Sequence, residues 1–203
     1  MPKIFISYRR SDSEDIAGRI YDRLVGQFSR EAVFFDVDTI PFGIDFRDFL
    51  KREVQQCQAL IAIIGPDWLT ARDCDGHRRI DNTADWVRIE IESALARSIP
   101  VIPLLVRKAR LPRPDELPHS LQNLAYRNAA TARAGRDFHR DMDVLIRNIT
   151  ALAAQFEHAT FSSSVEKSAS KNNPKRPPLV QKNYRRETIG SAQSSPPDAQ
   201  AQS

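Results

Sequence analysis

The sequence predicts an α/β fold in which a parallel sheet is covered by helices on both faces. Over residues 1–158, short apolar runs typical of strands alternate with segments that carry an apolar stripe at helical spacing. Such alternation is typical of parallel sheets with crossover helices. The run Ala59–Ile64 is apolar at every position, as expected of a strand buried on both faces.

The remaining elements follow in chain order. Ser11 and Glu14 form a capping-box pattern, which predicts the start of a first helix there. Its apolar stripe consists of Ile16, Ile20, Leu24 and Phe28. The other predicted helices are residues 46–56, 85–97 and 138–156. The predicted strands are residues 4–6, 32–36, 59–64 and 101–106, with residues 124–127 as the candidate for a fifth.

The positive charge of the chain belongs to its C-terminal part. The net charge is +4, and residues 161–203 hold seven Lys and Arg against three acidic residues, which is 7 − 3 = +4. The first 160 residues are therefore neutral, which argues against a domain that binds nucleic acid. The tail also holds nine serines and five prolines without apolar periodicity. We therefore expect a domain over 1–158 and a disordered basic tail over 159–203, with a nucleic-acid or anionic-lipid arm as the alternative for the tail.

Cysteine content and hydropathy restrict the class further. The 2 cysteines exclude a disulfide-rich secreted scaffold, and no apolar run approaches the roughly 20 residues of a membrane span. The first residues resemble a strand more than a signal peptide. These features predict a cytoplasmic protein with no membrane span.

Several catalytic patterns are absent from the sequence. It contains no GxGxxG after the first strand, no GxxxxGK[ST], no GxSxG and no HExxH. The third strand ends in Gly65 and Pro66, where a phospho-accepting receiver would need an aspartate. Cys74 and His77 have no second Cys/His pair at the spacing of a zinc site. We therefore interpret them as ordinary polar residues of a loop and expect no metal site.

Ligands of parallel α/β sheets bind beyond the carboxyl ends of the strands. In this sequence the segments that leave those ends are residues 7–13, 36–45, 65–84 and 107–120. The segment 65–84 is long and polar, a feature that is more often functional than structural.

Three motifs occur along the sequence: the strand end Phe5-Ile6-Ser7-Tyr8-Arg9-Arg10-Ser11-Asp12, the stretch from Val33 to Gly43, and the WxxxE pattern formed by Trp86 and Glu90. They resemble motifs of the Toll/interleukin-1 receptor (TIR) domain family, in which the second stretch includes the "BB" loop. They occur in the family's order, and the resemblance covers about residues 2–156. It implies a flavodoxin-like fold with five parallel strands in the order 2-1-3-4-5. It also implies either of two functions, signalling by association between TIR domains or cleavage of NAD+ at the nicotinamide bond.

The resemblance implies that Glu90 is the catalytic residue and that Trp86 contributes an aromatic wall. On a helical wheel Glu90 lies about 40° from Trp86, on the flank between the apolar face and solvent. An aromatic residue one turn earlier can partly desolvate such a carboxylate. The alternative is an ordinary surface glutamate, paired with Arg97 or another base.

Further substrate contacts are expected at the exit of the first strand and in the BB loop. Arg9 and Arg10 stand where the resemblance places the nucleotide, and guanidinium groups suit a pyrophosphate. The alternative is a surface basic pair balanced by Asp12 or Asp36. Tyr8 either packs on the sheet or faces the ligand, and the pattern leaves both open.

Phe42 and Gly43 lie in the loop that would cover the site, and Gly43 permits unusual backbone angles. A plain turn glycine is the alternative for Gly43. Pro41 stands where some NAD-cleaving relatives carry an acidic or polar residue, so the resemblance does not carry the substrate contacts of this loop over to this sequence.

Two functions of different classes remain. The first is an NAD+ hydrolase or ADP-ribosyl cyclase that uses NAD+ as substrate, needs no cofactor and is activated by self-association into a homo-oligomer. The second is a non-catalytic module that binds other TIR domains. The WxxxE pair favours the enzyme, since the resemblance implies that receptor adaptors usually lack this glutamate.

Overall fold

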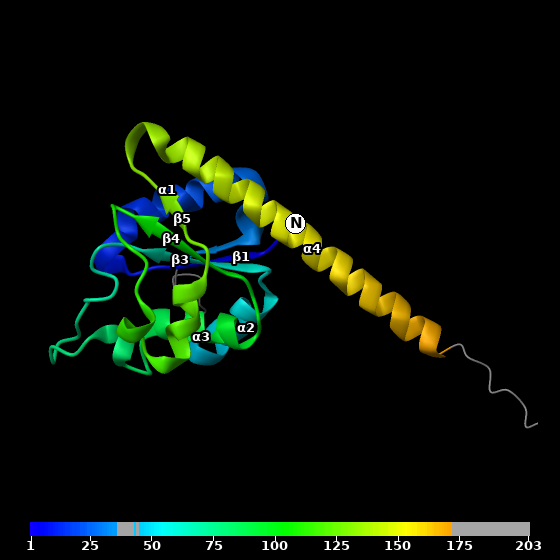
Figure 1. Cartoon of the computed structure of the whole chain (residues 1–203), viewed down its shortest axis with the longest axis horizontal. Helices are drawn as coiled ribbons and strands as arrows, with labels where there is room; N and C mark the ends of the chain where they lie inside the picture. The colour runs from blue at the N-terminus through cyan, green and yellow to red at the C-terminus, as the bar shows by residue number, and fades with distance from the viewer. Residues whose placement is uncertain (36–42, 44, 172–203) are drawn as a thin grey trace, which may run out of the picture.

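A computed structural model describes residues 1–35, 43 and 45–171 of the chain. Within these ranges the protein is a five-stranded parallel sheet with helices on both faces (Figure 1). The strands are β1 (Ile4–Ser7), β2 (Val33–Phe35), β3 (Ala59–Ile64), β4 (Val101–Val106) and β5 (Ala130–Ala132). The α-helices are α1 (Arg10–Phe28), α2 (Phe46–Gln56), α3 (Trp86–Ala96) and α4 (Phe138–Lys171). Short 3₁₀ helices are η1 (Arg30–Ala32), η3 (Arg79–Asp81), η4 (Pro114–Glu116), η5 (His119–Tyr126) and η6 (Gly135–Asp137).

The strand order is β2-β1-β3-β4-β5, and every pairing is parallel. The predicted flavodoxin-like order is thereby confirmed. β3 lies at the centre of the sheet, and all six of its residues are buried. Its uniformly apolar sequence follows from this position, because helices cover both of its faces.

Each face of the sheet has its own core. On one face α1 and α4 pack over residues such as Ile4, Ile6 and Ile61. On the other face α2, α3 and η5 pack over Phe5 and Leu60. Successive strand residues alternate between the two cores, as the pleat requires. Figure 1 shows the two helical layers on opposite sides of the strands.

The predicted fifth strand at residues 124–127 is wrong. Most of that segment belongs to η5, in which Leu121 and Leu124 are buried three residues apart, the repeat of a 3₁₀ helix. The fifth strand is instead β5, which pairs with the carboxyl end of β4. It is only three residues long and consists of Ala, Thr and Ala, so it has no apolar run to reveal it.

The predicted capping box at Ser11 and Glu14 is also wrong. α1 begins at Arg10, with Arg9 in the N-cap position. Ser13 has non-helical angles (φ −146°, ψ 20°), which separate the first turn from the rest of the helix. The predicted apolar stripe of α1 is buried throughout.

α4 extends beyond its predicted end at Phe156 and reaches Lys171. The first part of the segment expected to be disordered is therefore helical, and residues 172–203 lie outside the described residues. The buried positions of α4 run from Phe138 to Ala153 among the side chains that the structure describes. None of the helices in the described ranges has the length and hydrophobicity needed to cross a membrane.

We predict that a chain ending at residue 159 unfolds at nearly the same temperature as the full chain. The buried contacts of α4 described here end at Ala153, and the removed segment has no apolar period. Calorimetry of the two chains measures the difference. A fall of several degrees in the truncated chain would show that the tail packs on the domain, and Ile149→Ala in α4 provides the reference for losing a buried contact.

Candidate active site

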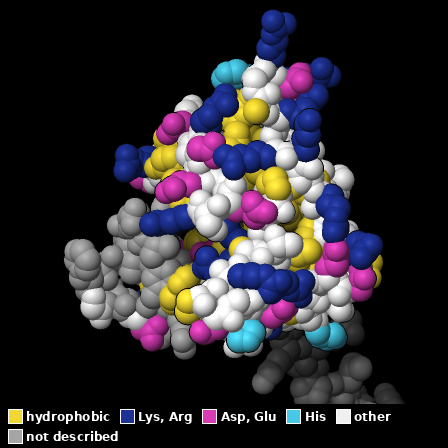
Figure 2. All heavy atoms as spheres, turned by 90° about the vertical axis from the view of Figure 1, so that its left-hand side faces the viewer, with side chains coloured by type: hydrophobic (Ala, Val, Ile, Leu, Met, Phe, Trp, Pro, Cys, Tyr) yellow, Lys and Arg dark blue, Asp and Glu magenta, His cyan; other side chains and the backbone are white. Residues whose placement is uncertain are grey.

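Tyr8, Arg9 and Arg10 directly follow β1, and Trp86 begins α3 after the long loop that leaves β3. Figure 2 shows this edge of the sheet from the front. Lys and Arg side chains and acidic side chains are interspersed on this face (Figure 2). β1 leads into Arg9 and α1, and β3 leads through a long loop into α3. Because all strands are parallel, these exits meet at the same edge of the sheet.

The start of α3 is fixed by its N-cap residue, Asp85. The Asp85 carboxylate accepts a hydrogen bond from the backbone N–H of Arg88 at 3.2 Å, which satisfies one of the free amides of the first turn. The preceding turn is closed by Asn82, whose side-chain oxygen accepts from Ala84 N at 2.8 Å. The helix therefore begins at a defined residue, and the positions of Trp86 and Glu90 follow from it.

Glu90 lies on the buried face of α3 and is only 7% exposed. It shares this face with Val87, Ile91 and Ala94, the residues that pack on the sheet. The helical wheel placed Glu90 on the flank, but the structure buries it more deeply than a flank position implies. The expectation of a surface position, which was part of the alternative for Glu90, is therefore wrong.

Trp86, one turn before Glu90, is 38% exposed. Its ring is thus neither a core side chain nor fully in solvent. A half-exposed aromatic residue beside a buried carboxylate provides a wall on which a planar ring can stack. The structure places the predicted pair together on one helix, with the carboxylate inside and the indole at the surface.

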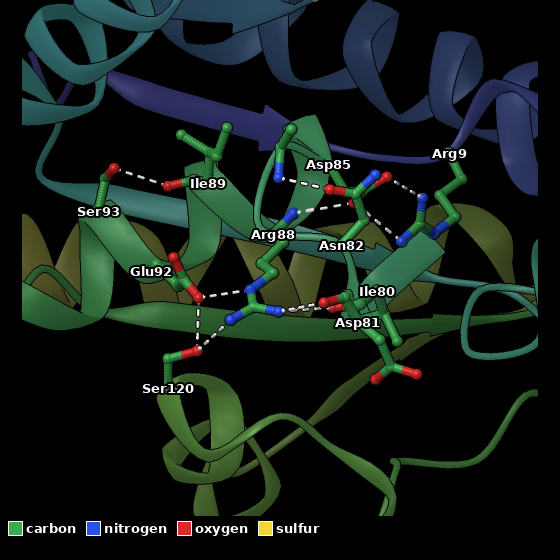
Figure 3. A network of polar contacts seen from close by, with 11 residues as sticks. Arg9, Ile80, Asp81, Asn82, Asp85, Arg88, Ile89, Glu92, Ser93 and Ser120 are labelled. Carbon is green, nitrogen blue, oxygen red and sulfur yellow. Dashed lines mark hydrogen bonds and ion pairs between the residues drawn. The ribbon is translucent and has the colours of Figure 1, made fainter. Parts of the chain in front are cut away.

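Arg9 is placed differently from its prediction. Its side chain is fully buried and forms a bidentate pair with Asp85, from Nη1 to Oδ2 at 2.9 Å and from Nη2 to Oδ1 at 3.0 Å (Figure 3). Its Nε donates to the backbone oxygen of Trp68 at 2.9 Å, and its guanidinium lies 5.6 Å from the centre of the Trp68 ring. Arg9 is therefore not one of a surface basic pair, and a substrate phosphate would have to displace Asp85 to reach it.

Tyr8 packs against the sheet, which is one of the two arrangements that the sequence pattern left open. Its ring stacks on Phe35 of β2, with ring centres 5.0 Å apart and nearly parallel planes. Tyr21 of α1 stacks on the same Phe35 at 4.7 Å. Tyr8 thus packs with the core under α1 and α4, whereas α3 and Glu90 cover the opposite face.

Arg10 is exposed at the first position of α1. Gly43 is exposed and has a φ of 83°, a left-handed conformation that favours glycine. The structure thus agrees with a turn at Gly43, which either interpretation of this residue requires. Phe42 and Pro41 lie outside the described residues.

Asp12 joins the exit of β1 to the exit of β3. Its carboxylate is buried and accepts hydrogen bonds from the backbone N–H groups of Gly65 at 2.9 Å and Asp67 at 2.8 Å. On the other side, Arg107 after β4 donates to the backbone oxygen of Asp12 at 2.8 Å. The exits of three neighbouring strands are thereby linked through one acidic residue.

Arg88 anchors the outer side of α3. Its guanidinium donates to the backbone oxygen of Asp81 at 2.8 Å, to Glu92 at 2.6 Å and to Ser120 of η5 at 3.3 Å (Figure 3). Asp81 itself is paired with Arg78, and this hydrogen bond lowers the pKa of the Asp81 carboxyl below its usual value. The loop before α3 is therefore held by ion pairs on its exposed side.

The described residues line two cavities in loops at this edge, and Trp86 and Glu90 line neither of these two. One of about 100 Å³ lies at the end of β3, and another of about 540 Å³ lies in the segment between Arg72 and Asn82. The second cavity is lined in part by Asp73 and His77, which with Asp75 place their potential metal-ligating atoms within 4.8 Å of one another. Asp73 already accepts from the amides of Asp75 and His77, so its carboxylate organises the turn. The expectation of no metal site stays a prediction.

The sequence did not reveal the partners of Arg9. The helical pattern predicts only that a helix starts near Asp85, and the sequence gives no signal that links Trp68 to Arg9. Two signals were present. Asp is a preferred N-cap residue directly before the WxxxE helix, and Arg9 continues the alternation of Phe5 and Ser7, which predicts that it points toward the α3 side of the sheet.

The fold and this site define an α/β domain with a parallel flavodoxin-like sheet and a buried acidic residue near the carboxyl ends of its strands. The model of the TIR domain family matches residues 4–146. The chain therefore belongs to the TIR domain family.

Two relatives with assigned activities are similar to this chain. It is 29% identical over 127 residues to a Drosophila melanogaster protein named NAD(+) hydrolase sarm1, and 29% identical over 126 residues to a Caenorhabditis elegans protein named NAD(+) hydrolase tir-1. Each match covers 62% of this chain but only 9% and 12% of the respective relative. The chain thus spans about a tenth of the length of these relatives.

Among solved structures, the TIR domains of the activated Roq1 resistosome, which directly recognizes the pathogen effector XopQ, have a similar fold. The TM-score is 0.55 at 10% sequence identity, and the match covers 73% of this chain and 99% of the other. At this identity the similarity concerns the fold alone.

We predict that Gly65→Ala destabilises the protein by about 2–3 kcal/mol. A Cβ atom at this position would lie 2.3 Å from Asp12 Oδ2, so the carboxylate would have to leave the amides that it binds. Urea unfolding monitored by circular dichroism measures the change. In the matched control Gly18→Ala in α1, the added methyl meets nothing within 4 Å and should stabilise the helix by up to about 1 kcal/mol. Equal effects of the two substitutions would contradict this role of Asp12.

Proposed function

We propose that this protein hydrolyses NAD+ at the bond between nicotinamide and ribose, with Glu90 as the catalytic residue. The observation that carries the proposal is the burial of Glu90, 7% exposed, one turn from the half-exposed Trp86. Membership of the TIR family and similarity to two relatives named NAD(+) hydrolases support the same activity.

The chemistry needs only one carboxylate. Nicotinamide is cationic in NAD+ and leaves as a neutral molecule, since the electron pair of the broken carbon–nitrogen bond remains on its ring nitrogen. Positive charge then develops on the ribosyl carbon, as in glycoside hydrolysis. Water adds to this carbon and loses a proton, so the products are nicotinamide, ADP-ribose and H+. In a cyclase, a nucleophilic atom of the ADP-ribosyl group itself takes the place of water.

Glu90 would stabilise the developing charge or hold the ribose hydroxyls. A carboxylate in a partly dry environment interacts more strongly with a cation than one in water, and the interaction is greatest in the transition state. Trp86 would stack on a planar ring of the substrate, and the exposed Arg10 would bind the pyrophosphate at the β1 exit. Arg9 is buried in its pair with Asp85.

We predict that Glu90→Gln lowers the rate of nicotinamide release by on the order of a hundredfold or more, which corresponds to ~3 kcal/mol. Glutamine preserves size and helix propensity but removes the negative charge opposite the ribosyl cation. The measurement is the initial rate of nicotinamide formation by chromatography. The control Glu31→Gln changes an exposed glutamate of η1, which precedes β2 and so lies at the opposite end of the sheet, and should leave the rate unchanged. A wild-type rate for Glu90→Gln would exclude Glu90 as the catalytic residue, whereas wild-type protein that releases no nicotinamide would favour the non-catalytic TIR interaction module.

We further propose that the active form is a homo-oligomer of TIR domains. Turnover should then rise more steeply than first order with protein concentration, because mass action couples activity to assembly. Specific activity measured over a wide dilution series, with and without a crowding agent, tests this expectation. Constant specific activity throughout the series would mean that the monomer is fully active.

A further inference from the structure

We propose that Arg9 and Asp85 are positioning residues for this reaction, acting as a buried clamp that fixes α3 and thereby Glu90 against the exit of β1. The inference rests on the proposed function of Glu90. It assigns Arg9 a role other than phosphate binding and adds Asp85 to the residues on which catalysis depends.

The geometry of the pair restricts the motion of both side chains. Its side chains are 0% and 2% exposed, and both Nη atoms of Arg9 are directed at the two oxygens of Asp85 (Figure 3). The third contact, from Nε to the backbone oxygen of Trp68, fixes the plane of the guanidinium. Because all three of its nitrogens are bonded, the Arg9 guanidinium can rotate little, and the Asp85 carboxylate is held with it.

Asp85 occupies the N-cap position of α3. As the N-cap residue it accepts from Arg88 N through Oδ1, the same oxygen that accepts from Arg9 Nη2. The clamp therefore holds the helix at its first turn. Glu90 follows five residues later, about 7.5 Å along the helix axis. Because a short helix moves as a rigid body, a shift of its first turn displaces Glu90 and Trp86 together.

The adjacent arginines Arg9 and Arg10 lie in opposite environments. Arg9 points into the protein and its charge is balanced by Asp85, whereas Arg10 is exposed at the start of α1. Arg79 approaches the same carboxylate from the exposed side, with its Nε 3.2 Å from Asp85 Oδ2. Asp85 thus has a cationic partner on each side, and a phosphate could reach Arg9 only by competing with a buried carboxylate.

The test uses full-length variants and separates kcat from KM for NAD+. The main variant is the double substitution Arg9→Met and Asp85→Ser, which removes both charges of the clamp but leaves a serine that can still cap α3. We expect kcat to fall by on the order of a hundredfold, the effect of a misplacement of about 1 Å, while KM changes less than about threefold. Arg9→Lys keeps the charge without the bidentate contact and should lie between this variant and the wild type.

Arg88→Met is the matched control. Like Arg9, Arg88 makes several side-chain hydrogen bonds, but it lies on the outer side of α3, where it joins the helix to η5 and the preceding loop. We expect a lower melting temperature and a kcat close to that of the wild type. An equal loss of kcat in this control and in the double variant would overturn the proposal, because the effect would then follow from general destabilisation.

A raised KM with unchanged kcat in the Arg9 variants would also overturn the proposal and identify Arg9 as a substrate ligand. Amide hydrogen exchange without NAD+ examines the clamp independently of catalysis. We expect faster exchange of the amides of residues 86–91 in the double variant, and unchanged exchange there would refute the clamp. Failure of the proposed function would appear differently, as wild-type protein that releases no nicotinamide.

Discussion

The ion pair between Arg9 and Asp85 joins three segments that lie far apart in the sequence, namely the exit of β1, the turn that contains Trp68 and the start of α3. Both charges are removed from water, so each depends on the other. Removing one partner of such a pair typically costs about 3–5 kcal/mol, because the remaining charge stays buried without compensation. Replacing both partners by neutral residues costs far less. The pair therefore contributes more to the position of α3 than to the overall stability.

The parallel sheet explains why this position matters. Its central strand is apolar on both faces, so the polar groups needed for chemistry are available only where the strands end. At that edge Asp12 binds the amides after β3, and Arg9 binds the N-cap of α3. Glu90 is then held on the buried side of a helix that is anchored at its first turn. Such an anchored helix suits the proposed role of Glu90, because electrostatic stabilisation of a transition state requires a group that is positioned in advance.

Much of the fold could be predicted from local patterns. The apolar runs identified β1, β3 and β4, and the helical stripes identified α2 and α3 almost to the residue. The prediction failed where local patterns were weak or where a distant partner decided the outcome. β5 has three small residues and no apolar signal, whereas the spacing of Leu121 and Leu124 is compatible with a 3₁₀ helix as well as with other structures.

The site was predicted less completely than the fold, for a physical reason. The pair of Trp86 and Glu90 lies within one helix, and its spacing is visible in the sequence. The environment of Arg9 depends on Asp85, which is 76 residues away. A charged residue at a strand exit suits either a ligand or a buried partner, and only the tertiary structure distinguishes them. The helical wheel likewise predicts the direction of the Glu90 side chain but not how deeply it is buried, because burial depends on how closely α3 packs on the sheet.

Chromatography of NAD+ incubated with concentrated wild-type protein tests the central claim most directly. The account predicts that nicotinamide appears in the same amount as NAD+ disappears, with linear or cyclic ADP-ribose as the second product. Intact NAD+ after prolonged incubation would contradict it. Cleavage at the pyrophosphate, which yields nicotinamide mononucleotide and AMP, would contradict it equally, because that reaction has no role for a carboxylate facing the ribosyl carbon.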